Sequence, residues 1–244
     1  MTCLLVHGAA GRFGSLIVRA AKATPELEVR EAGRNTDLSK ALPGCDAAID
    51  VSQPSGTTRV VSAALATGTP VVVGTTGHSA AELAALRDAA QNLPILVAPN
   101  FSVGVNLLFW LTQRAVESLG KEFRAEILEL HHELKKDAQS GTAQKLGEIV
   151  TRVHGQTYAE VVRHGRHGLT GQRLPEEIGM HAIRGGDITG EHTVYLIGPG
   201  ERLELSHRAA NRDIFARGAL RAAQWLASRP AGWYEMADAL NLPR

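Results

Sequence analysis

Short apolar runs alternate with helical patterns along the N-terminal part of the chain. The first apolar run, Cys3 to Val6, leads through a glycine-rich turn into a pattern that places Leu16, Ile17 and Ala20 on one helix face. A proline ends this pattern, and the segment "LEVREAG" has the composition of a second strand. The order strand, helix, strand predicts a βαβ unit.

The same alternation continues as far as residue 101. The later elements are a strand at "AAIDVS", a helix over 56–67, a strand at "TPVVVGTTG", a helix at "SAAELAALRDAAQ" and a strand at "PILVAPN". Ser79 and Glu82 have the spacing of a capping box at the start of the second of these helices. Uniformly apolar strands that alternate with helices predict a parallel sheet covered on both faces.

Beyond residue 101 the order of the elements changes. The pattern predicts a helix over 104–119, an amphipathic strand at "FRAEILELHHEL", a helix at "SGTAQKLGEIVTRVHG", strands at "MHAIRGGDITGEHTVYLIG" and "ERLELSHRAA", and a last helix at "FARGALRAAQWLAS". Several strands in succession predict an open sheet, either mixed or antiparallel. We therefore expect an α/β protein of two domains, residues 1–101 with 213–244 and residues 102–212.

The composition narrows the range of partners. Lysine and arginine number 26 against 25 acidic residues, so the chain lacks the basic excess of a nucleic-acid-binding protein. No apolar stretch reaches the length of about 20 residues that a membrane span needs, and the N-terminus lacks the charged region of a signal peptide. With two cysteines, Cys3 and Cys45, the chain is expected to be a reduced cytoplasmic protein that binds neither nucleic acid nor membrane.

Gly8, Gly11 and Gly14 follow the first strand with the spacing G-x-x-G-x-x-G. Glycines in a strand–turn–helix context let backbone N–H groups approach a pyrophosphate, so this loop predicts a dinucleotide site. Arg12 adds a cation near the phosphates. The alternative is a glycine-rich turn that binds no ligand.

The second predicted strand ends with Arg34, twenty positions after Gly14. The residue at this place contacts the ribose, and an arginine favours the 2′-phosphate of NADPH whereas a carboxylate would bind the 2′-hydroxyl of NADH. NADPH is therefore the preferred cofactor, and NADH stays open because Glu31 is also near. Arg34 could otherwise be a solvated loop residue.

The segment "ELHHELKKDAQSGTA", residues 129–143, concentrates proton donors and cations before a predicted helix. Successive strand residues point to opposite faces, so only one of His131 and His132 is expected in any one pocket. Ser140, Gly141 and Thr142 form the first turn of the helix, where unpaired N–H groups attract a carboxylate. Together with Lys135 or Lys136, these groups predict a site for an anionic substrate that must be protonated.

The same segment also fits simpler structures. The two histidines with Asp137 could bind a metal, but no further clustered ligand is evident in the sequence, so we expect no metal. The lysines could be a solvated loop and Ser140 only a helix cap. For the whole chain, the alternatives are another dinucleotide-dependent reductase of a small carboxylic acid, or a redox sensor that binds NADPH. An aldehyde-oxidising mechanism would need a placed thiolate, and Cys45 has no histidine near it in the sequence.

The segment "ELHHELKKDAQSGTA" closely resembles the signature of the 4-hydroxy-tetrahydrodipicolinate reductase family. The resemblance extends to "GAAGRFG", "DVSQPSGT", "GTTGH", "APNFSVGVN", "RGGDITGEHTVYL" and "HRAANRDIFARGALRAAQWL". Several features depart from the family, among them the acidic contact for the ribose, whose place is taken by Gly33 and Arg34. Gln139 stands where a proline is usual, residues 155–178 match poorly, and His7 before the first glycine is unusual and has no evident function.

The resemblance implies a Rossmann-like dinucleotide-binding domain and an α+β substrate domain whose open mixed sheet forms a homotetramer. It implies that His131 and Lys135 donate the proton, and that the substrate, a dicarboxylate, is held by His132, Lys135, Ser140, Gly141 and Thr142. The residues expected around the cofactor are Gly8, Ala10, Gly11, Arg12, Phe13, Gly14, Arg34, Gly74, Thr75, Thr76, Ala98, Pro99, Asn100 and Phe101. The reaction implied is hydride transfer from the nicotinamide to an unsaturated cyclic imine in the biosynthesis of lysine and diaminopimelate.

Overall fold

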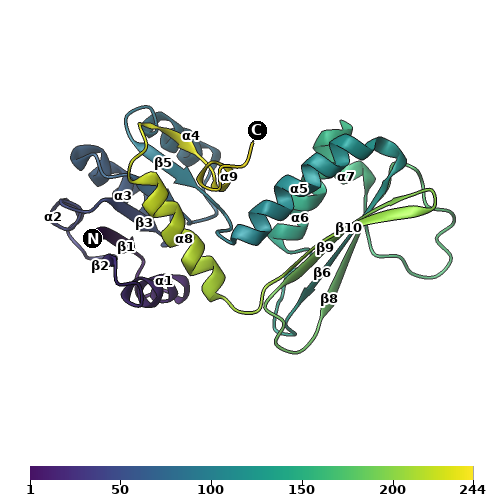
Figure 1. Cartoon of the computed structure of the whole chain (residues 1–244), viewed down its shortest axis with the longest axis horizontal. Coiled ribbons are helices and arrows are strands. Elements are labelled where there is room, and N and C mark those ends of the chain that lie inside the picture. The colour runs from purple at the N-terminus through teal and green to yellow at the C-terminus, as the bar shows by residue number, and fades with distance from the viewer. Residues whose placement is uncertain (244) are drawn as a thin grey trace. The chain divides into compact units, whose positions relative to one another are not determined.

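The computed structural model describes residues 1–243 and divides into two compact units (Figure 1). The first unit contains Met1–Val103 together with the C-terminal segment that begins at Asp213. The second unit is Gly104–Arg212. Each unit has its own sheet and its own core, so each is described separately.

The first unit is built on a six-stranded sheet with the order β11-β5-β4-β3-β1-β2, and all its strand pairs are parallel. The strands are β1 (Thr2–His7), β2 (Leu27–Ala32), β3 (Ala47–Asp50), β4 (Val71–Val73), β5 (Pro94–Val97) and β11 (Gly232–Tyr234). The parallel sheet predicted from the apolar runs is thus confirmed. The edge strand β11 was not predicted.

Helices cover both faces of this sheet. On one face, α1 (Arg12–Lys22), α8 (Asp213–Leu226) and α9 (Met236–Ala239) share a core with Leu4 and Val6 of β1. On the other face, α2 (Leu38–Ala41), α3 (Pro54–Thr67) and α4 (Ala80–Ala89) pack around Leu5 of the same strand.

Details of two of these helices can be compared with the sequence patterns. In α1 the fully buried residues include Ile17, Val18 and Ala21, so the buried face is rotated slightly from the predicted one. The capping box predicted for Ser79 and Glu82 is present at the start of α4.

The second unit contains a five-stranded sheet with the order β10-β9-β6-β8-β7. Its elements are α5 (Val103–Leu119), the 3₁₀ helix η1 (Gly120–Glu122), β6 (Arg124–His131), α6 (Gly141–His154), α7 (Tyr158–Val161), β7 (Val162–His164), β8 (Ile178–Arg184), β9 (Glu191–Gly198) and β10 (Glu201–Arg208). The central strand β6 runs parallel to β8 and antiparallel to β9, so the sheet is mixed, as predicted.

The two faces of this second sheet differ. Side chains from α5 and α6, among them Leu108 and Leu146, pack against Ile127, Met180 and Val194 to form one core. The side chains that alternate with these on the strands point to the opposite face. That face carries two exposed isoleucines, with 46% of Ile183 and 40% of Ile197 accessible. Within the described part of the chain, none of the helices combines the length and apolar character needed to cross a bilayer.

Candidate active site

The glycine loop after β1 has the geometry that its sequence predicts. Gly8 has φ +87°, a conformation that L side chains rarely adopt, and a Cβ there would lie 2.7 Å from the carbonyl oxygen of Val51. Gly11 caps the N-terminus of α1 and donates its N–H to the carbonyl of Gly8 at 2.9 Å. A Cβ on Gly14 would collide with that same carbonyl, so glycine here lets α1 approach the loop closely.

The loop lies where parallel sheets of this kind bind ligands. The chain leaves β1 for β2 on one side and later places β3 on the other side, which makes the ends of β1 and β3 the switch point of the sheet. Phe13 of α1 lies against Phe101 at this end, with ring centroids 6.0 Å apart and an interplanar angle of 28°. A Cβ on Gly74 would lie 2.6 Å from Cε2 of Phe101. At the carboxyl ends of these strands, the glycine loop therefore lies close to Gly74 and Phe101. This arrangement fits a dinucleotide.

The other predicted cofactor residues lie in the same unit, in different surroundings. Ala98 and Thr75 are buried, Pro99 and Thr76 are exposed, and Asn100 accepts the N–H of Ser102 at 2.8 Å. Thr75 uses its hydroxyl inside the protein, where it donates to Asp50 at 2.7 Å. A ligand would therefore contact the backbone of the Gly74–Thr76 turn and not the Thr75 hydroxyl.

Arg34 is exposed in the loop after β2. Its carbonyl oxygen accepts a hydrogen bond from the guanidinium of Arg59 on α3, which also donates to the carbonyl of Thr36 at 3.3 Å. Glu31, the alternative contact for the ribose, pairs with Lys22 at 2.7 Å. The structure thus adds a second arginine, Arg59, to the loop expected to hold the ribose, and no pattern in the sequence had indicated it.

In the second unit, Glu129 contacts two of the predicted site residues, His131 and Ser140. It lies on the helix-covered face of β6 and is completely buried. One carboxylate oxygen accepts the backbone N–H of Ser140 at 3.1 Å and the guanidinium of Arg184 at 2.9 Å, and the other lies 2.9 Å from Nδ1 of His131. Burial alone would raise the pKa of Glu129, but the hydrogen bonds from His131, Ser140 and Arg184 outweigh it and lower this pKa well below its usual range. The carboxylate is therefore ionised.

His192 on β9 completes this cluster. Its ring lies edge-on to His131 at 5.2 Å, and its Nε2 lies 3.1 Å from the hydroxyl of Ser140. Burial, aided by the neighbouring His131, lowers the pKa of His192 to about 4. His192 is consequently neutral at neutral pH, while Glu129 provides a fixed negative charge.

Glu129, His131 and His192 also bring one potential metal-ligand atom each to within 4.8 Å of one another. The expectation that no further ligand stands beside the histidine pair was therefore wrong. Two ligands of one tetrahedral zinc ion at ~2.1 Å would lie roughly 3.4 Å apart, whereas Glu129 and His131 are 2.9 Å apart and Arg184 already neutralises the carboxylate. The spacing is that of a carboxylate–imidazole ion pair.

The start of α6 is a capped helix N-terminus. The Ser140 hydroxyl accepts the N–H of Ala143 at 3.2 Å, and Ser140 is only 3% exposed. The hydroxyl is thus engaged as a helix cap, and Gly141 and Thr142 are the first residues of α6. Nearby, Nζ of Lys135 contacts both carboxylate oxygens of Asp137 at 2.8 Å.

His132 follows the end of β6 and has surroundings different from those of His131. It lines an open cavity of about 610 Å³ together with residues of the segment before α6 and with Gly186, Asp187 and Arg212. Arg212 is an exposed cation on this cavity, and no sequence motif had indicated it.

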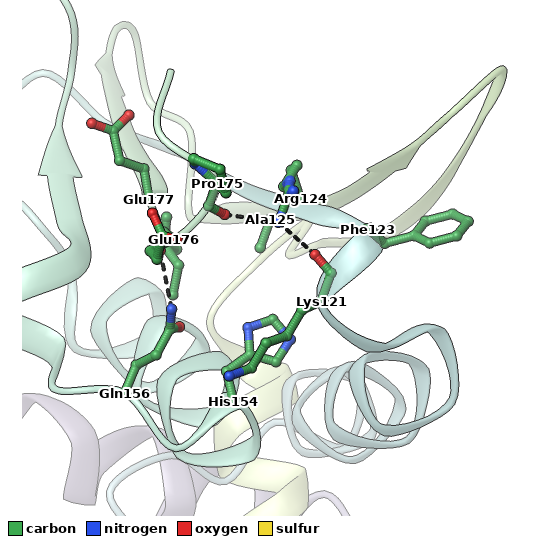
Figure 2. A pocket seen from close by; sticks show the side chains of 10 residues that line it. Lys121, Phe123, Arg124, Ala125, His154, Gln156, Pro175, Glu176 and Glu177 are labelled. Carbon is green, nitrogen blue, oxygen red and sulfur yellow. Dashed lines mark hydrogen bonds between the residues drawn. The ribbon is translucent and has the colours of Figure 1, made fainter. Parts of the chain in front are cut away.

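A second, smaller cavity of about 110 Å³ lies at the other end of β6 (Figure 2). Arg124 spans it by donating to the carbonyl oxygens of Lys121 at 2.6 Å and Pro175 at 2.9 Å. None of the predicted site residues lines this cavity.

Cys45 is not suited to be the thiolate that aldehyde oxidation needs. Burial, with Cys3 close by, raises the pKa of Cys45 to about 12.

Comparisons with known proteins agree with this arrangement. Residues 2–101 match the family model described as "Dihydrodipicolinate reductase, N-terminus", and residues 104–240 match "Dihydrodipicolinate reductase, C-terminus". The chain is 46% identical over 243 residues to the 4-hydroxy-tetrahydrodipicolinate reductase of Akkermansia muciniphila, covering 99% of both chains. It is 42% identical over 266 residues to the enzyme of that name from Anaeromyxobacter dehalogenans strain 2CP-C, covering 99% of this chain and 98% of the relative.

Solved structures show the same fold. The dipicolinate-bound dihydrodipicolinate reductase of Paenisporosarcina sp. TG-14 superposes with a TM-score of 0.78 at 22% identity, covering 100% of both chains. A probable dehydrogenase from Thermotoga maritima gives a TM-score of 0.61 at 11% identity, covering 98% of this chain and 92% of the other.

Proposed function

The chain belongs to the dihydrodipicolinate reductase family, and we propose that it reduces 4-hydroxy-tetrahydrodipicolinate, by way of dihydrodipicolinate, to tetrahydrodipicolinate. This reaction is a step in the biosynthesis of lysine and diaminopimelate. The observation that supports it most directly is the buried pair of Glu129 and His131, which shares its carboxylate with the start of α6. One group of side chains thus joins a proton donor to a carboxylate-binding helix N-terminus.

The substrate is a dicarboxylate, and the second unit offers groups to hold its charges. The N-terminus of α6, which begins at Gly141, attracts one carboxylate through the positive end of the helix dipole. Lys135 contributes a full charge, for which the substrate competes with Asp137. His132 and Arg212 line the adjoining cavity and are placed to hold the rest of the molecule.

The reduction needs a hydride and a proton. When bound in the first unit, the reduced nicotinamide supplies the hydride, which adds to the unsaturated imine. His131 then protonates the carbanion or enamine that this addition leaves, and Lys135 is the second donor. The ionised carboxylate of Glu129 lies against Nδ1 of His131 and fixes the orientation of its ring, as a carboxylate does in other carboxylate–imidazole pairs.

We propose NADPH as the preferred cofactor, with NADH as a weaker alternative. Arg34 is a cation of the loop after β2, and the Arg59 guanidinium of α3 lies against the same loop; a guanidinium binds a 2′-phosphate with paired hydrogen bonds. Glu31 is engaged by Lys22 and so is less suited to bind a 2′-hydroxyl.

We also propose that the open face of the second sheet forms a homotetramer. This face presents Leu128, Ile183, Tyr195 and Ile197, which point away from the core that α5 and α6 cover. Exposed apolar surface of this kind marks association sites. The cytoplasmic location expected from the sequence stays a prediction.

The test is steady-state oxidation of NADPH and of NADH, with substrate generated in situ from pyruvate and aspartate semialdehyde by the enzyme that condenses them. We expect fast oxidation that requires all components, and a higher kcat/KM with NADPH. Omission of pyruvate is the matched control, because it measures cofactor oxidation that occurs without substrate. Tight NADPH binding without substrate-dependent turnover would support the sensor or another reductase instead.

A further inference from the structure

His7 and Asp50 form a buried pair at the switch point of the first sheet. They are the last residues of β1 and β3, and they are 2% and 0% exposed. Nδ1 of His7 lies 2.8 Å from one oxygen of Asp50. An isolated buried charge is costly, so an ionisable pair at this place calls for a role beyond packing.

Asp50 accepts hydrogen bonds from three hydroxyl groups in addition to His7. Ser52 and Thr57 donate at 2.5 Å, and Thr75 donates at 2.7 Å. Burial alone would raise the pKa of Asp50, but the hydrogen bonds from His7 and the three hydroxyls lower it, so the carboxylate is ionised. The Asp50 carboxylate is therefore hydrogen-bonded to the end of β1, the loop after β3, the start of α3 and the turn after β4.

An ionised carboxylate accepts hydrogen bonds and cannot donate, so it sets the direction of every bond around it. Because Thr75 donates its proton to Asp50, its oxygen accepts the N–H of Ser52 at 2.9 Å. Thr57 likewise donates to Asp50, so His78 must donate from Nε2 to Thr57 at 3.1 Å. The hydrogen-bond directions in this network follow from the charge on Asp50.

The network ends in the turn expected to line the nicotinamide. Besides the Thr75 bond, the N–H of Gly74 donates to the Asp50 carbonyl at 2.8 Å. On the other side, the N–H of Val51 donates to the carbonyl of His7, the residue directly before Gly8. The Asp50 region is thus bonded both to the residue that begins the glycine loop and to the Gly74–Thr76 turn.

The His7 ring is fixed in a close-fitting space. A Cβ on Gly56 of α3 would lie 2.3 Å from Oγ of Ser52 and 3.0 Å from Cε1 of His7, so glycine at this position makes room for both the hydroxyl and the imidazole. Nε2 of His7 is buried and has no hydrogen-bond partner among the residues that the structure describes. His7 therefore interacts with the network through Nδ1 alone.

We propose that His7 and Asp50 are positioning residues for the dinucleotide: through the Asp50 carboxylate they hold the glycine loop and the Gly74–Thr76 turn in the arrangement that the cofactor binds. This rests on the proposed cofactor site. Without the donor at His7, the carboxylate loses a charge-assisted bond and the Thr75 turn loosens. Cofactor binding must then order the turn again, which weakens affinity.

The experiment compares His7→Ala with His7→Asn. An asparagine amide N–H can occupy the position of Nδ1, so His7→Asn keeps the bond to Asp50 while His7→Ala removes it. We expect His7→Ala to raise the Kd and the KM for NADPH roughly tenfold, with kcat at saturating cofactor and the substrate KM unchanged. His7→Asn should stay close to the parent chain.

Two further measurements separate positioning from stability. Thr75→Val should weaken NADPH binding as His7→Ala does, whereas Thr75→Ser should not. Unfolding midpoints are recorded for all four variants. If His7→Ala lowers the midpoint but leaves the Kd for NADPH unchanged, the residue is only structural and the proposal is wrong.

Direct NADPH titration without substrate keeps this test separate from the proposed reaction. A parent chain that binds NADPH but does not turn over refutes the substrate assignment and leaves the effect of His7 measurable. A parent chain that binds no dinucleotide overturns both proposals.

Discussion

The carboxylate of Glu129 lies 2.9 Å from Nδ1 of His131, and the same carboxylate accepts the backbone N–H of Ser140 at the start of α6. A single buried charge thus orients the group proposed to donate the proton and anchors the helix proposed to bind a substrate carboxylate. Arg184 neutralises this charge from the neighbouring strand β8. Proton donation and carboxylate binding therefore depend on the same side chain.

Glu129→Gln is expected to lower kcat by about 10²-fold, the lower end of the range for general acid catalysis. Glutamine keeps an oxygen that can accept the Ser140 N–H, but it removes the negative charge that lies against Nδ1 of His131. The measurement is kcat under saturating substrate, with the Kd for NADPH as the control because the first unit is untouched. An unchanged kcat would show that the charge on Glu129 serves structure alone.

Asp137→Asn is expected to lower the substrate KM by roughly three- to tenfold. The Lys135 hydrogen bond lowers the pKa of Asp137, so the pair is ionised and a substrate carboxylate must displace Asp137 from Lys135. A higher KM in Asp137→Asn would mean that Asp137 holds Lys135 in place for the substrate instead.

Lys135→Ala, in contrast, should lower turnover by about 10²- to 10⁴-fold without weakening NADPH binding.

Arg34→Ala and Arg59→Ala are each expected to raise the KM for NADPH about tenfold and to leave the KM for NADH nearly unchanged. The reason is that only NADPH carries a 2′-phosphate, which Arg34 can bind directly and for which Arg59 holds the Arg34 loop by donating to its carbonyls. The measurement is the ratio of kcat/KM for the two cofactors. Equal losses with both cofactors would indicate that the arginines support the loop and do not select the phosphate.

Stability should decrease as the pH falls from about 6.5 to about 4, and His192 should account for part of this decrease. Burial lowers its pKa from 6.5 to about 4, so in this interval the unfolded chain binds a proton that the folded chain does not. The full effect is on the order of 3 kcal/mol. Urea unfolding at several pH values gives the free energy of unfolding as a function of pH. This free energy should change less with pH in His192→Gln than in His164→Gln, an exposed control.

Ile197→Lys is expected to reduce the oligomer to smaller species, because a charge would be buried in the proposed interface. Ile197 is 40% exposed on the open face of the second sheet. The matched control is Leu203→Lys, since Leu203 is 38% exposed and pairs with buried Leu196 on the helix-covered side. Sedimentation of both variants measures the change. Equal masses for both would place the interface elsewhere.

The strands and helices that the sequence predicted share long, regular patterns. The apolar runs of β1, β3, β4 and β5 are continuous because helices bury both faces of the sheet. The edge strand β11, Gly232–Tyr234, lacks such an apolar run, and all three of its residues are only partly buried. It exists because Gly232 pairs with Pro94 of β5, a contact that no local pattern contains.

The candidate site divides in the same way. Glu129 lies two residues before His131 on one strand, so alternation alone could have placed both on the same face. Arg184 and His192 could not be found by this reasoning. They reach the cluster because His131 of β6 pairs with Arg184 of β8 and Glu129 of β6 pairs with His192 of β9. Register between distant strands depends on the whole sheet, and a single sequence does not reveal it.

The position of β6 at the centre of the second sheet has a consequence for how the protein is handled in solution. Its buried face carries Glu129 and His131, and Leu130, which lies between them on the chain, points to the face proposed to join the subunits. Separation of the subunits would leave this strand without support on one side of the sheet. Specific activity should therefore fall on extreme dilution and recover on concentration, which links catalytic output to the amount of protein present.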